Sequence, residues 1–528
     1  MRTCANSKRS RVTEGAPARR SLSAETIVNM AVAAVSGIGA QIVVLAITPF
    51  LIWTIGLERY GFWALCSSIS RYGMLTDVLF APIITTVAAA KRAEDLACVR
   101  RIATFATLFY LGLVAIFVPL AAVAGGLLLR LFPMSPDLAR DAPRFFTGYV
   151  AYFFVSVAVT GLASVLNGLG LLRKTATINA IGTLLYAAAA VVLVLRGFGL
   201  WALLDALVVQ VAFSAVALYA LCRGQLGHVF VSPLRVGRAL AIELLTFGGW
   251  VQLSTLATLL GGETDQILIG AFVGVPAVGL YEVGAKLARA IRSLALFPNT
   301  ALLPSIAALA TDPKGERVLQ VVVRASRLVC LITVFAAALL VGGSTSIVTV
   351  WLGHVDGVTI AATVLVVLAL NNLLETIVSV PITAMRALRK PKLESFATGV
   401  GAAINLAITI TLVRPFGIYG VLAGTLGGTL AAFAIFYAFF ARVQRVSITT
   451  ALFAWIVPLS VAGAVTATTF HFVFAGLGGL DATKTLGIVR LVGAAACAAA
   501  AYASVVHVLH IFAPGELRRT LTSAGSRA

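Results

Sequence analysis

The sequence predicts an all-α integral membrane protein with fourteen transmembrane helices. Hydrophobic residues make up 60% of its 528 residues and charged residues only 11%, whereas a soluble domain carries about 25% charged residues. Its apolar runs approach or exceed the roughly 20 residues that a helix needs to cross a bilayer. They lack the period-two alternation of barrel strands, and the bilayer requires every backbone group to be satisfied internally. The helix is therefore the expected element throughout.

The apolar runs form a first set of six, a second set of six and a final pair. The first set covers about 29–55, 61–90, 102–129, 145–170, 176–195 and 199–222. The second set covers about 241–272, 276–309, 319–350, 358–385, 394–413 and 417–440. The final pair covers about 450–475 and 485–511. The polar segments between these runs are too short for a separately folded soluble domain.

Basic residues predict the orientation of the chain. With a cytoplasmic N-terminus, most of the 40 Lys and Arg residues fall in cytoplasmic segments, as the positive-inside rule requires. This distribution explains the net charge of +20 without nucleic acid as a partner. We therefore expect a multi-pass protein of the bacterial inner (cytoplasmic) membrane with both termini in the cytoplasm.

The two sets of six helices are predicted to be duplicated repeats. The matched features, first half then second half, are Arg173-Lys174 with Arg389-Lys390, Arg196-Gly197-Phe198-Gly199 with Arg414-Pro415-Phe416-Gly417, Tyr60-Gly61 with Val278-Gly279, and Arg71 with Arg289. Because each repeat holds an even number of spans, the repeats run parallel, and transporters of this kind bind substrate between their halves.

The repeats define the predicted domain organisation. A disordered cytoplasmic tail (1–26) precedes the first repeat (27–222), and a cytoplasmic linker (223–240) joins it to the second repeat (241–442). An extra helix pair (443–511) and a second cytoplasmic tail (512–528) follow.

A few charged residues lie inside the apolar runs. A charge at the bilayer centre costs about 2.5 to 3.5 kcal/mol on insertion scales, so such residues usually line a wet pathway. Four basic residues exceed what nearby carboxylates can balance, and a surplus of buried positive charge suits an anionic ligand, phosphate above all. The predicted substrate-binding residues are Arg71, Lys286, Arg289 and Arg292.

Carboxylates near these residues are candidates to balance charge or to bind a coupling proton or sodium ion. They are Asp77, Glu263, Asp265, Glu282 and Glu375. Structural ion pairing, such as Glu282 with Lys286, stays open as an alternative for part of the set. For Glu375, an ion site and a helix-packing hydrogen bond are both open.

Motifs for catalysis or ATP binding are absent from the sequence. It has no GxxxxGK[ST] motif, no nucleophile–base spacing, and six scattered cysteines without metal-ligand spacing. The longest predicted outer loop, 130–144, carries only Asp137 and Asp141, which argues against a membrane glycosyltransferase or polymerase. We expect a secondary transporter, not an enzyme, without a cofactor or metal.

Two loose motifs in register carry a family resemblance. The first reads Gly56-Leu57-Glu58-Arg59-Tyr60-Gly61-Phe62-Trp63-Ala64-Leu65, then Leu75-Thr76-Asp77. The second reads Asp265-Gln266-Ile267-Leu268-Ile269-Gly270, then Gly274, Val278-Gly279-Leu280-Tyr281 and Lys286. Both resemble the polysaccharide and O-antigen repeat-unit flippases of the multidrug/oligosaccharidyl-lipid/polysaccharide (MOP) exporter superfamily. Val78 stands where that family commonly has glycine.

The resemblance implies a V-shaped bundle whose cationic cavity accepts the pyrophosphate and sugars of an undecaprenyl-linked oligosaccharide. It implies that alternating access flips this repeat unit from the cytoplasmic to the periplasmic leaflet, with membrane lipids as partners. A polysaccharide polymerase and export machinery are further candidate partners, and the final helix pair is a candidate lipid groove. The alternative within the superfamily is a cation-coupled multidrug exporter, against which the basic surplus argues.

Overall fold

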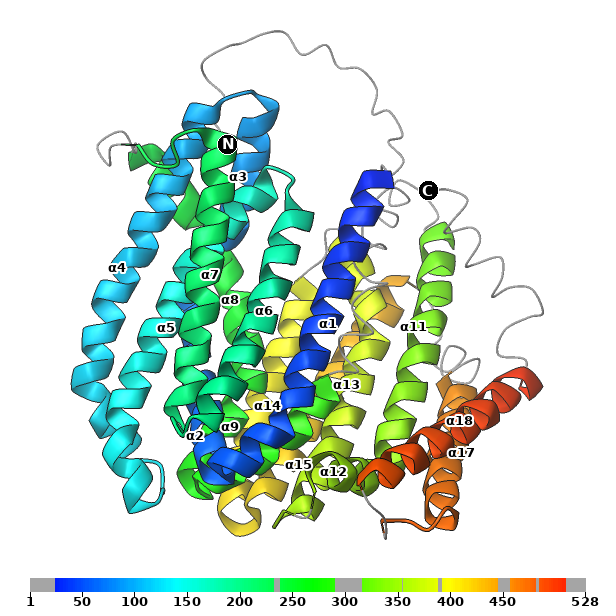
Figure 1. Cartoon of the computed structure of the whole chain (residues 1–528). Helices are drawn as coiled ribbons and strands as arrows, with labels where there is room; N and C mark the ends of the chain where they lie inside the picture. Colours follow the sequence, from blue (N-terminus) through cyan, green and yellow to red (C-terminus); the bar gives the residue numbers. More distant parts are fainter. Residues whose placement is uncertain are drawn as a thin grey trace. The chain divides into compact units, whose positions relative to one another are not determined.

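The computed structural model describes residues 24–231, 238–289, 316–353, 355–387, 392–444, 456–480 and 484–509. All regular structure in these ranges is helical (Figure 1), which confirms the predicted all-α class. The chain divides into two compact units, the first reaching to Leu259 and the second beginning at Leu260. Each unit is described by itself.

The described helices confirm a multi-pass membrane protein. Eleven of them are long and apolar enough to cross a bilayer, and the bent pair α2 and α3 would make a twelfth. Helix α8 (Arg238–Gly262) covers the first part of the expected run 241–272, and the helical residues 275–289 cover the described part of the expected run 276–309, whose remainder lies outside the described residues. The count of fourteen, the duplication and the V shape are compatible with these elements and stay predictions.

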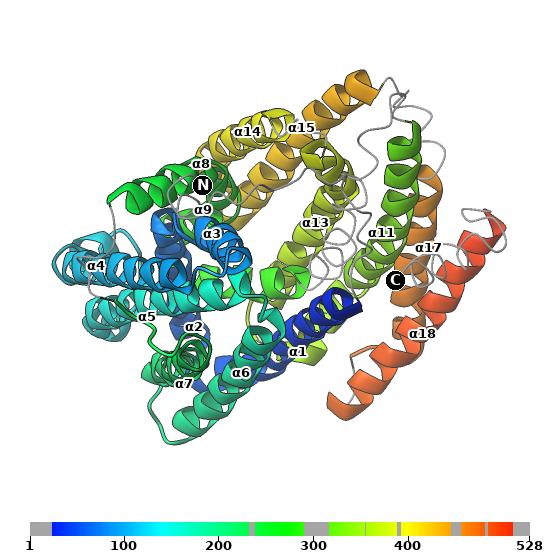
Figure 2. The same ribbon diagram turned by 90° about the horizontal axis from the view of Figure 1, so that it is seen from above.

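The first unit is built from consecutive helices joined by short loops. Its elements are α1 (Ala24–Ile55), α2 (Leu57–Arg71), the 3₁₀ helix η1 (Tyr72–Thr76), α3 (Phe80–Arg92), α4 (Leu96–Leu129), α5 (Pro136–Gly168), α6 (Leu172–Leu195), α7 (Trp201–Leu226) and most of α8 (Arg238–Gly262). Short loops favour antiparallel packing of neighbours. Accordingly, α4 packs on α5 and α6 on α7, while α1 packs on α6 (Figure 2).

The apolar run expected over 61–90 is bent rather than straight. Helix α2 ends at Arg71, and the axis turns by 46° before α3 begins. Asp77 lies in the bend with a non-helical ψ of 61°. Pro82 explains the break, because a proline inside a continuous helix would clash with the carbonyl group of Val78, whereas the first turn of a new helix tolerates it.

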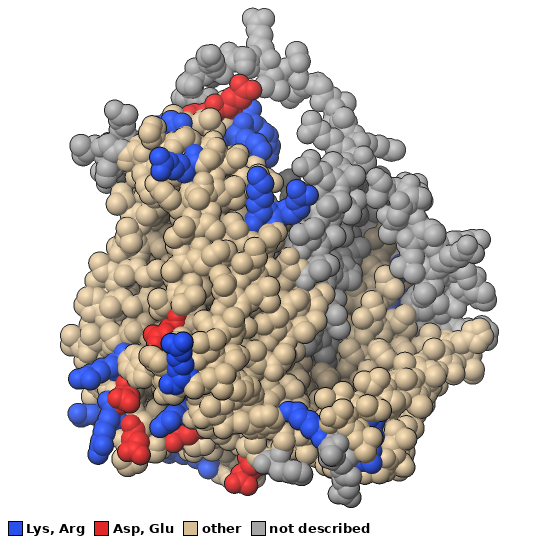
Figure 3. Space-filling view, viewed as in Figure 1, with Lys and Arg blue, Asp and Glu red and all other residues tan. Residues whose placement is uncertain are grey.

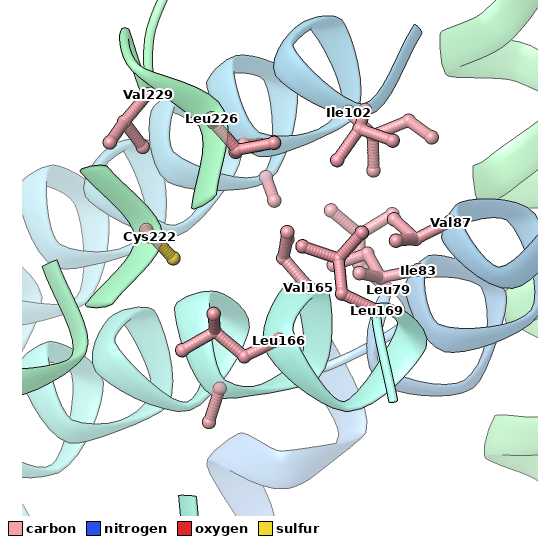
Figure 4. Packing of buried hydrophobic residues seen from close by; sticks show 14 of the residues in the cluster. Leu79, Ile83, Val87, Ile102, Val165, Leu166, Leu169, Cys222, Leu226 and Val229 are labelled. Atoms are coloured by element: carbon pink, nitrogen blue, oxygen red, sulfur yellow. The ribbon is translucent and has the colours of Figure 1, made fainter. Parts of the chain in front are cut away.

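A buried apolar cluster joins α3, α4, α5 and α7 near one end of the first unit (Figure 4). Ile83 and Val87 of α3 and Val165 of α5 are fully buried in it. The backbones approach closely there, since a Cβ atom on Gly168 would lie 2.7 Å from Val87 Cβ. This packing fixes the ends of these helices relative to one another.

The second unit contains the helical residues 275–289 and eight labelled helices. The labelled helices are α9 (Thr264–Phe272), α11 (Glu316–Gly342), α12 (Ser344–Leu352), α13 (Val358–Ala387), α14 (Lys392–Phe416), α15 (Ile418–Gln444), α17 (Val457–Gly476) and α18 (Lys484–Val508). Helix α14 packs closely on α15, and α11 packs on both α13 and α17. The final pair is anchored on α11, where the Tyr502 hydroxyl donates to the Leu331 carbonyl oxygen at 2.7 Å.

The surface of the first unit suits a bilayer. Helix α4 exposes large apolar side chains along its length, among them Ile116 at 62% and Val123 at 85%. In Figure 3, Lys and Arg side chains gather towards the ends of the helices of this unit, and the surface between the ends is almost entirely uncharged. An apolar band between charged ends is typical of membrane-spanning helices.

Candidate functional site

The predicted site residues fall into a group in the first unit and a group in the second. Arg71 and Asp77 lie on either side of the bend between α2 and α3. The second group comprises Glu263, Asp265, Glu282, Lys286, Arg289 and Glu375. Arg292 lies outside the described residues.

Arg71, the last residue of α2, lies beside a polar and aromatic cluster on α5. Its Nη2 atom donates to Ser67 Oγ at 3.3 Å, and a side-chain hydrogen bond also links Ser67 to Tyr149. The Tyr149 ring packs edge-on against Tyr152, with 5.6 Å between the centroids. Helices α2 and α5 therefore place a guanidinium group beside two phenol rings.

Asp77 is held by groups from α4 and α8. Its Oδ1 atom accepts a hydrogen bond of 2.5 Å from the Tyr110 hydroxyl, and its carbonyl oxygen accepts one of 2.5 Å from Gln252 Nε2. The Asp77 carboxylate also accepts from the backbone of Leu79 and Phe80, so a phenol and two backbone groups hold it. Tyr110 and Gln252 were missed because no spacing relates them to Asp77.

Asp265 on α9 is buried, with 2% of the residue exposed. Its Oδ2 atom accepts hydrogen bonds from Thr425 Oγ1 of α15 at 2.6 Å and from the Tyr281 hydroxyl at 3.0 Å. A carboxylate surrounded by hydroxyl donors in the membrane can hold either a proton or a small cation. Glu263, two residues earlier, immediately precedes α9.

Glu282, which is itself buried, forms an ion pair along its own helix. Its Oε1 atom lies 2.6 Å from Arg289 Nη2, two helical turns further on, and its Oε2 atom accepts from Gln266 Nε2 at 2.7 Å. The ion pair of Glu282 with Lys286 that the sequence left open stays a prediction. The Glu282 side chain is 5% exposed and that of Arg289 is 41% exposed, so the guanidinium group is anchored at one end and reachable by a ligand.

Three polar residues of α13 lie near the same helix. Asn372 Nδ2 donates to the Ala288 carbonyl oxygen at 2.9 Å, which ties α13 to the backbone beside Arg289. Asn371 Nδ2 donates to Glu375 Oε1 at 3.3 Å within α13. This bond lies within a single helix, so the helix-packing and ion-site interpretations of Glu375 both stay predictions.

Side chains that could bind a metal are dispersed over the part of the chain that the structure describes. No three His, Cys, Asp or Glu residues there are grouped so that they could hold a metal ion. The described polar cluster in the second unit is instead a network of hydrogen bonds and one ion pair.

Sequence comparisons relate the chain to a polysaccharide-biosynthesis family and to two membrane proteins. The family described as "Polysaccharide biosynthesis protein" matches residues 152–355. "Probable flippase AglR" of Haloferax volcanii is 25% identical over 399 residues, covering 74% of this chain and 79% of the relative. "Uncharacterized membrane protein EpsK" of Bacillus subtilis is 22% identical over 391 residues, covering 73% of this chain and 76% of the relative.

Comparisons with solved structures identify the fold. The inward closed conformation of the lipid II flippase MurJ aligns with a TM-score of 0.66 over 92% of this chain and 98% of that one, at 13% identity. An inward-facing multidrug resistance MATE family transporter of the MOP superfamily aligns with a TM-score of 0.60 over 80% and 99%, at 14% identity. Identities this low establish the shared fold alone.

These findings confirm the resemblance that the two sequence motifs indicated. Of the two relatives, the one with a named activity is a probable flippase, and the two solved structures are a flippase and a transporter, in agreement with the prediction that the chain is not an enzyme. The chain is a multi-pass membrane protein that resembles polysaccharide-biosynthesis flippases in sequence and shares the fold of the solved MurJ flippase and MATE transporter structures.

Proposed function

We propose that the protein flips an oligosaccharide linked to undecaprenyl pyrophosphate from the cytoplasmic to the periplasmic leaflet of the inner membrane. The flippase relatives and the MOP fold support transport of a lipid-linked sugar. The observation that carries the proposal is Arg289, which is 41% exposed while its partner Glu282 is buried. An arginine held in this way presents planar, paired donors to phosphate oxygens.

The role of Glu282 in this proposal is to orient Arg289. A carboxylate taken out of water needs a cation and further donors, and Arg289 and Gln266 supply both. Glu282 in turn restricts the guanidinium rotamers, so less entropy is lost when a pyrophosphate binds. Arg71, Lys286 and Arg292 are the other proposed substrate contacts, and the two phenol rings beside Arg71 suit sugar rings.

The driving force is proposed to be a coupled proton or sodium ion. Asp265 is the first candidate because its carboxylate is buried among hydroxyl donors that suit either ion. Glu263, Glu375 and Asp77 are further candidates. A polysaccharide polymerase and export machinery are proposed partners, since a flipped repeat unit needs an acceptor.

The second candidate function is multidrug export, which the similarity to MATE transporters favours. The two functions require opposite charges in the substrate pathway. A cationic drug would be repelled by the surplus of basic residues, whereas a pyrophosphate would be attracted.

Replacement of Arg289 distinguishes the two functions. We expect Arg289→Ala to abolish surface polysaccharide in the producing cell while the protein stays in the membrane at its normal level. The matched control is Arg140→Ala, an exposed arginine outside the site, which should leave output unchanged. Normal polysaccharide from Arg289→Ala, with loss of drug resistance, would support multidrug export instead.

A further inference from the structure

Several helix ends meet at one end of the first unit. Lys91 Nζ at the end of α3 donates to the Leu169 carbonyl oxygen at 2.6 Å. Arg100 near the start of α4 donates through Nε at 3.0 Å and Nη2 at 2.5 Å to the Leu226 carbonyl oxygen. The ends of α3, α5 and α7 and the start of α4 are thereby tied together, and α6 begins three residues after Leu169.

This end carries several basic residues of the unit. They are Lys91, Arg92, Arg100, Arg101, Arg173, Lys174 and Arg223. The positive-inside rule assigns such an end to the cytoplasmic face. In Figure 3, Lys and Arg side chains gather at this end of the unit, above the uncharged band.

A pocket of about 440 Å³ opens between the start of α6 and the end of α7 at this level. Arg173, Lys174 and Thr177 form its polar side, and all three are exposed. Its apolar side consists of Ile178, Ala217 and Leu221. Ile178 and Leu221 rest against the buried cluster, so the apolar side of the pocket is firmly supported.

Neither Arg173 nor Lys174 forms an ion pair with another described residue. Across the described part of the chain, the ion pairs of the structure involve Arg289 and Arg386 and neither Arg173 nor Lys174. The Arg173 backbone carbonyl accepts a hydrogen bond from Thr177 Oγ1 at 3.0 Å, which leaves the guanidinium group out of that contact.

The apolar side of the pocket continues along the membrane face of both helices. Exposed apolar residues follow it towards the middle of the bilayer, with Ile181 at 42% and Leu185 at 36% on α6 and Val216 at 70% on α7. Ile178, Ile181 and Leu185 are spaced by three and four residues and therefore share one helix face. A ligand held by the basic pair would thus extend over an apolar surface.

We propose that this pocket binds an anionic phospholipid of the cytoplasmic leaflet. The phosphodiester headgroup lies against Arg173 and Lys174, and an acyl chain runs along Ile178, Ile181 and Leu185. Arg and Lys beside a membrane surface attract anionic headgroups, and the apolar continuation favours a lipid over a soluble phosphate. The site lies on the outer face of α6 and α7 and is separate from the proposed substrate contacts.

The test measures lipid binding directly with the purified full-length protein. Phosphatidylglycerol and phosphatidylcholine are titrated separately, and bound lipid is counted by native mass spectrometry. The double variant R173Q/K174Q should bind phosphatidylglycerol about thirtyfold more weakly, since each basic residue near a membrane surface contributes about a fivefold preference. The control R140Q/R144Q removes the same charge from exposed positions at the start of α5 and should keep wild-type affinity.

A second variant tests the apolar side of the pocket. Ala217→Trp fills it and should weaken binding of phosphatidylglycerol while leaving the basic pair in place. Competition with inorganic phosphate distinguishes the two sources of phosphate, because a lipid site should not be displaced by millimolar phosphate. Wild-type affinity in R173Q/K174Q, or full displacement by inorganic phosphate, would overturn the proposal.

These measurements need no oligosaccharide substrate. Lipid binding lost in R173Q/K174Q with normal binding in Arg289→Ala would support the phospholipid site whatever the transported molecule is. Equal loss of phosphatidylglycerol binding in Arg289→Ala would instead place the measured lipid in the substrate site and overturn the inference.

Discussion

Glu282 and Arg289 show how a charged residue can be kept accessible inside a membrane protein. Glu282 is 5% exposed on its side chain and takes its two donors from Arg289 and Gln266. A carboxylate with these partners is stabilised in its charged form. The ion pair therefore fixes the orientation of the Arg289 guanidinium group, while 41% of the side chain remains exposed.

The first prediction concerns Glu282→Gln. Loss of this charge frees the guanidinium rotamers, so we expect transport to fall close to the level of Arg289→Ala. Because Arg289 is partly exposed, the free energy of unfolding should fall by only about 1 kcal/mol. A double-mutant cycle on transport checks this expectation, since residues acting through one contact are not additive. Additive losses in the double variant would contradict a positioning role.

The sequence identified the charged residues of this cluster but not their partners. Asp265, Glu282 and Arg289 were visible because charges are rare in apolar runs. Thr425, which donates to Asp265, lies 160 residues away, and a threonine in an apolar helix usually bonds its own backbone. Tertiary packing alone brings such hydroxyl groups to a carboxylate, so no spacing in one sequence reveals them.

Thr425→Val gives the second prediction, because valine keeps the shape and removes one donor to Asp265. We expect the free energy of unfolding to fall by about 1 kcal/mol, the usual net contribution of one hydrogen bond. The ion dependence of transport should also change if Asp265 holds the coupling ion. Thr411→Val is the matched control, as Thr411 is exposed and bonds its own helix. Identical behaviour of the two variants would exclude Asp265 as the coupling site.

At the scale of single helices, the apolar runs predicted the spans well and the bend poorly. Length and hydrophobicity identify a span because the bilayer sets both. The break between α2 and α3 depends on Pro82 and on Asp77, whose carboxylate bonds Tyr110 of another helix. Pro82 was a usable signal for the bend, whereas the phenol partner was not.

Tyr110→Phe tests what holds this bend and is the third prediction. The hydroxyl group is lost while the ring, 1% exposed, keeps its packing. Because Asp77 is partly buried and still accepts from the backbone of Leu79 and Phe80, loss of the phenol donor should destabilise the protein by about 1 kcal/mol. Thermal unfolding in detergent measures the effect, and Tyr219→Phe, an exposed tyrosine of α7, is the control. Equal unfolding temperatures for both variants would show that the bend does not depend on this bond.

At the scale of the whole molecule, the positive charge divides into two populations with different roles. The larger population lies at helix ends, where residues such as Lys91 and Arg100 cap neighbouring helices. The smaller one, including Arg71 and Arg289, lies within the helical runs. Composition and the positive-inside rule could predict this division, but they could not predict which carbonyl or carboxylate each side chain meets.

The final helix pair also bears on the whole molecule, because it lies outside the predicted repeats and is nevertheless closely packed. A Cβ atom on Gly342 of α11 would collide with the Ala467 backbone of α17, and one on Gly343 would collide with the Phe470 ring. The pair α17 and α18 adds its own buried cluster around Phe470 and Phe474. It is therefore a part of the second unit and not a loosely attached extension.

The fourth prediction follows from this close approach. Gly342→Val should force α17 away from α11, because the Ala467 backbone cannot move aside as a flexible side chain can. We expect the free energy of unfolding to fall by about 3 kcal/mol, near the upper end of the range for overpacked cores. The expected readouts are a lower unfolding temperature and less protein in the membrane. Gly112→Val is the matched control, because a Cβ atom on Gly112 meets nothing within 4 Å. A Gly342→Val variant as stable as this control but unable to export polysaccharide would show that the final pair acts in transport itself. A variant that kept both its stability and its polysaccharide export would show that the packing against α17 is dispensable.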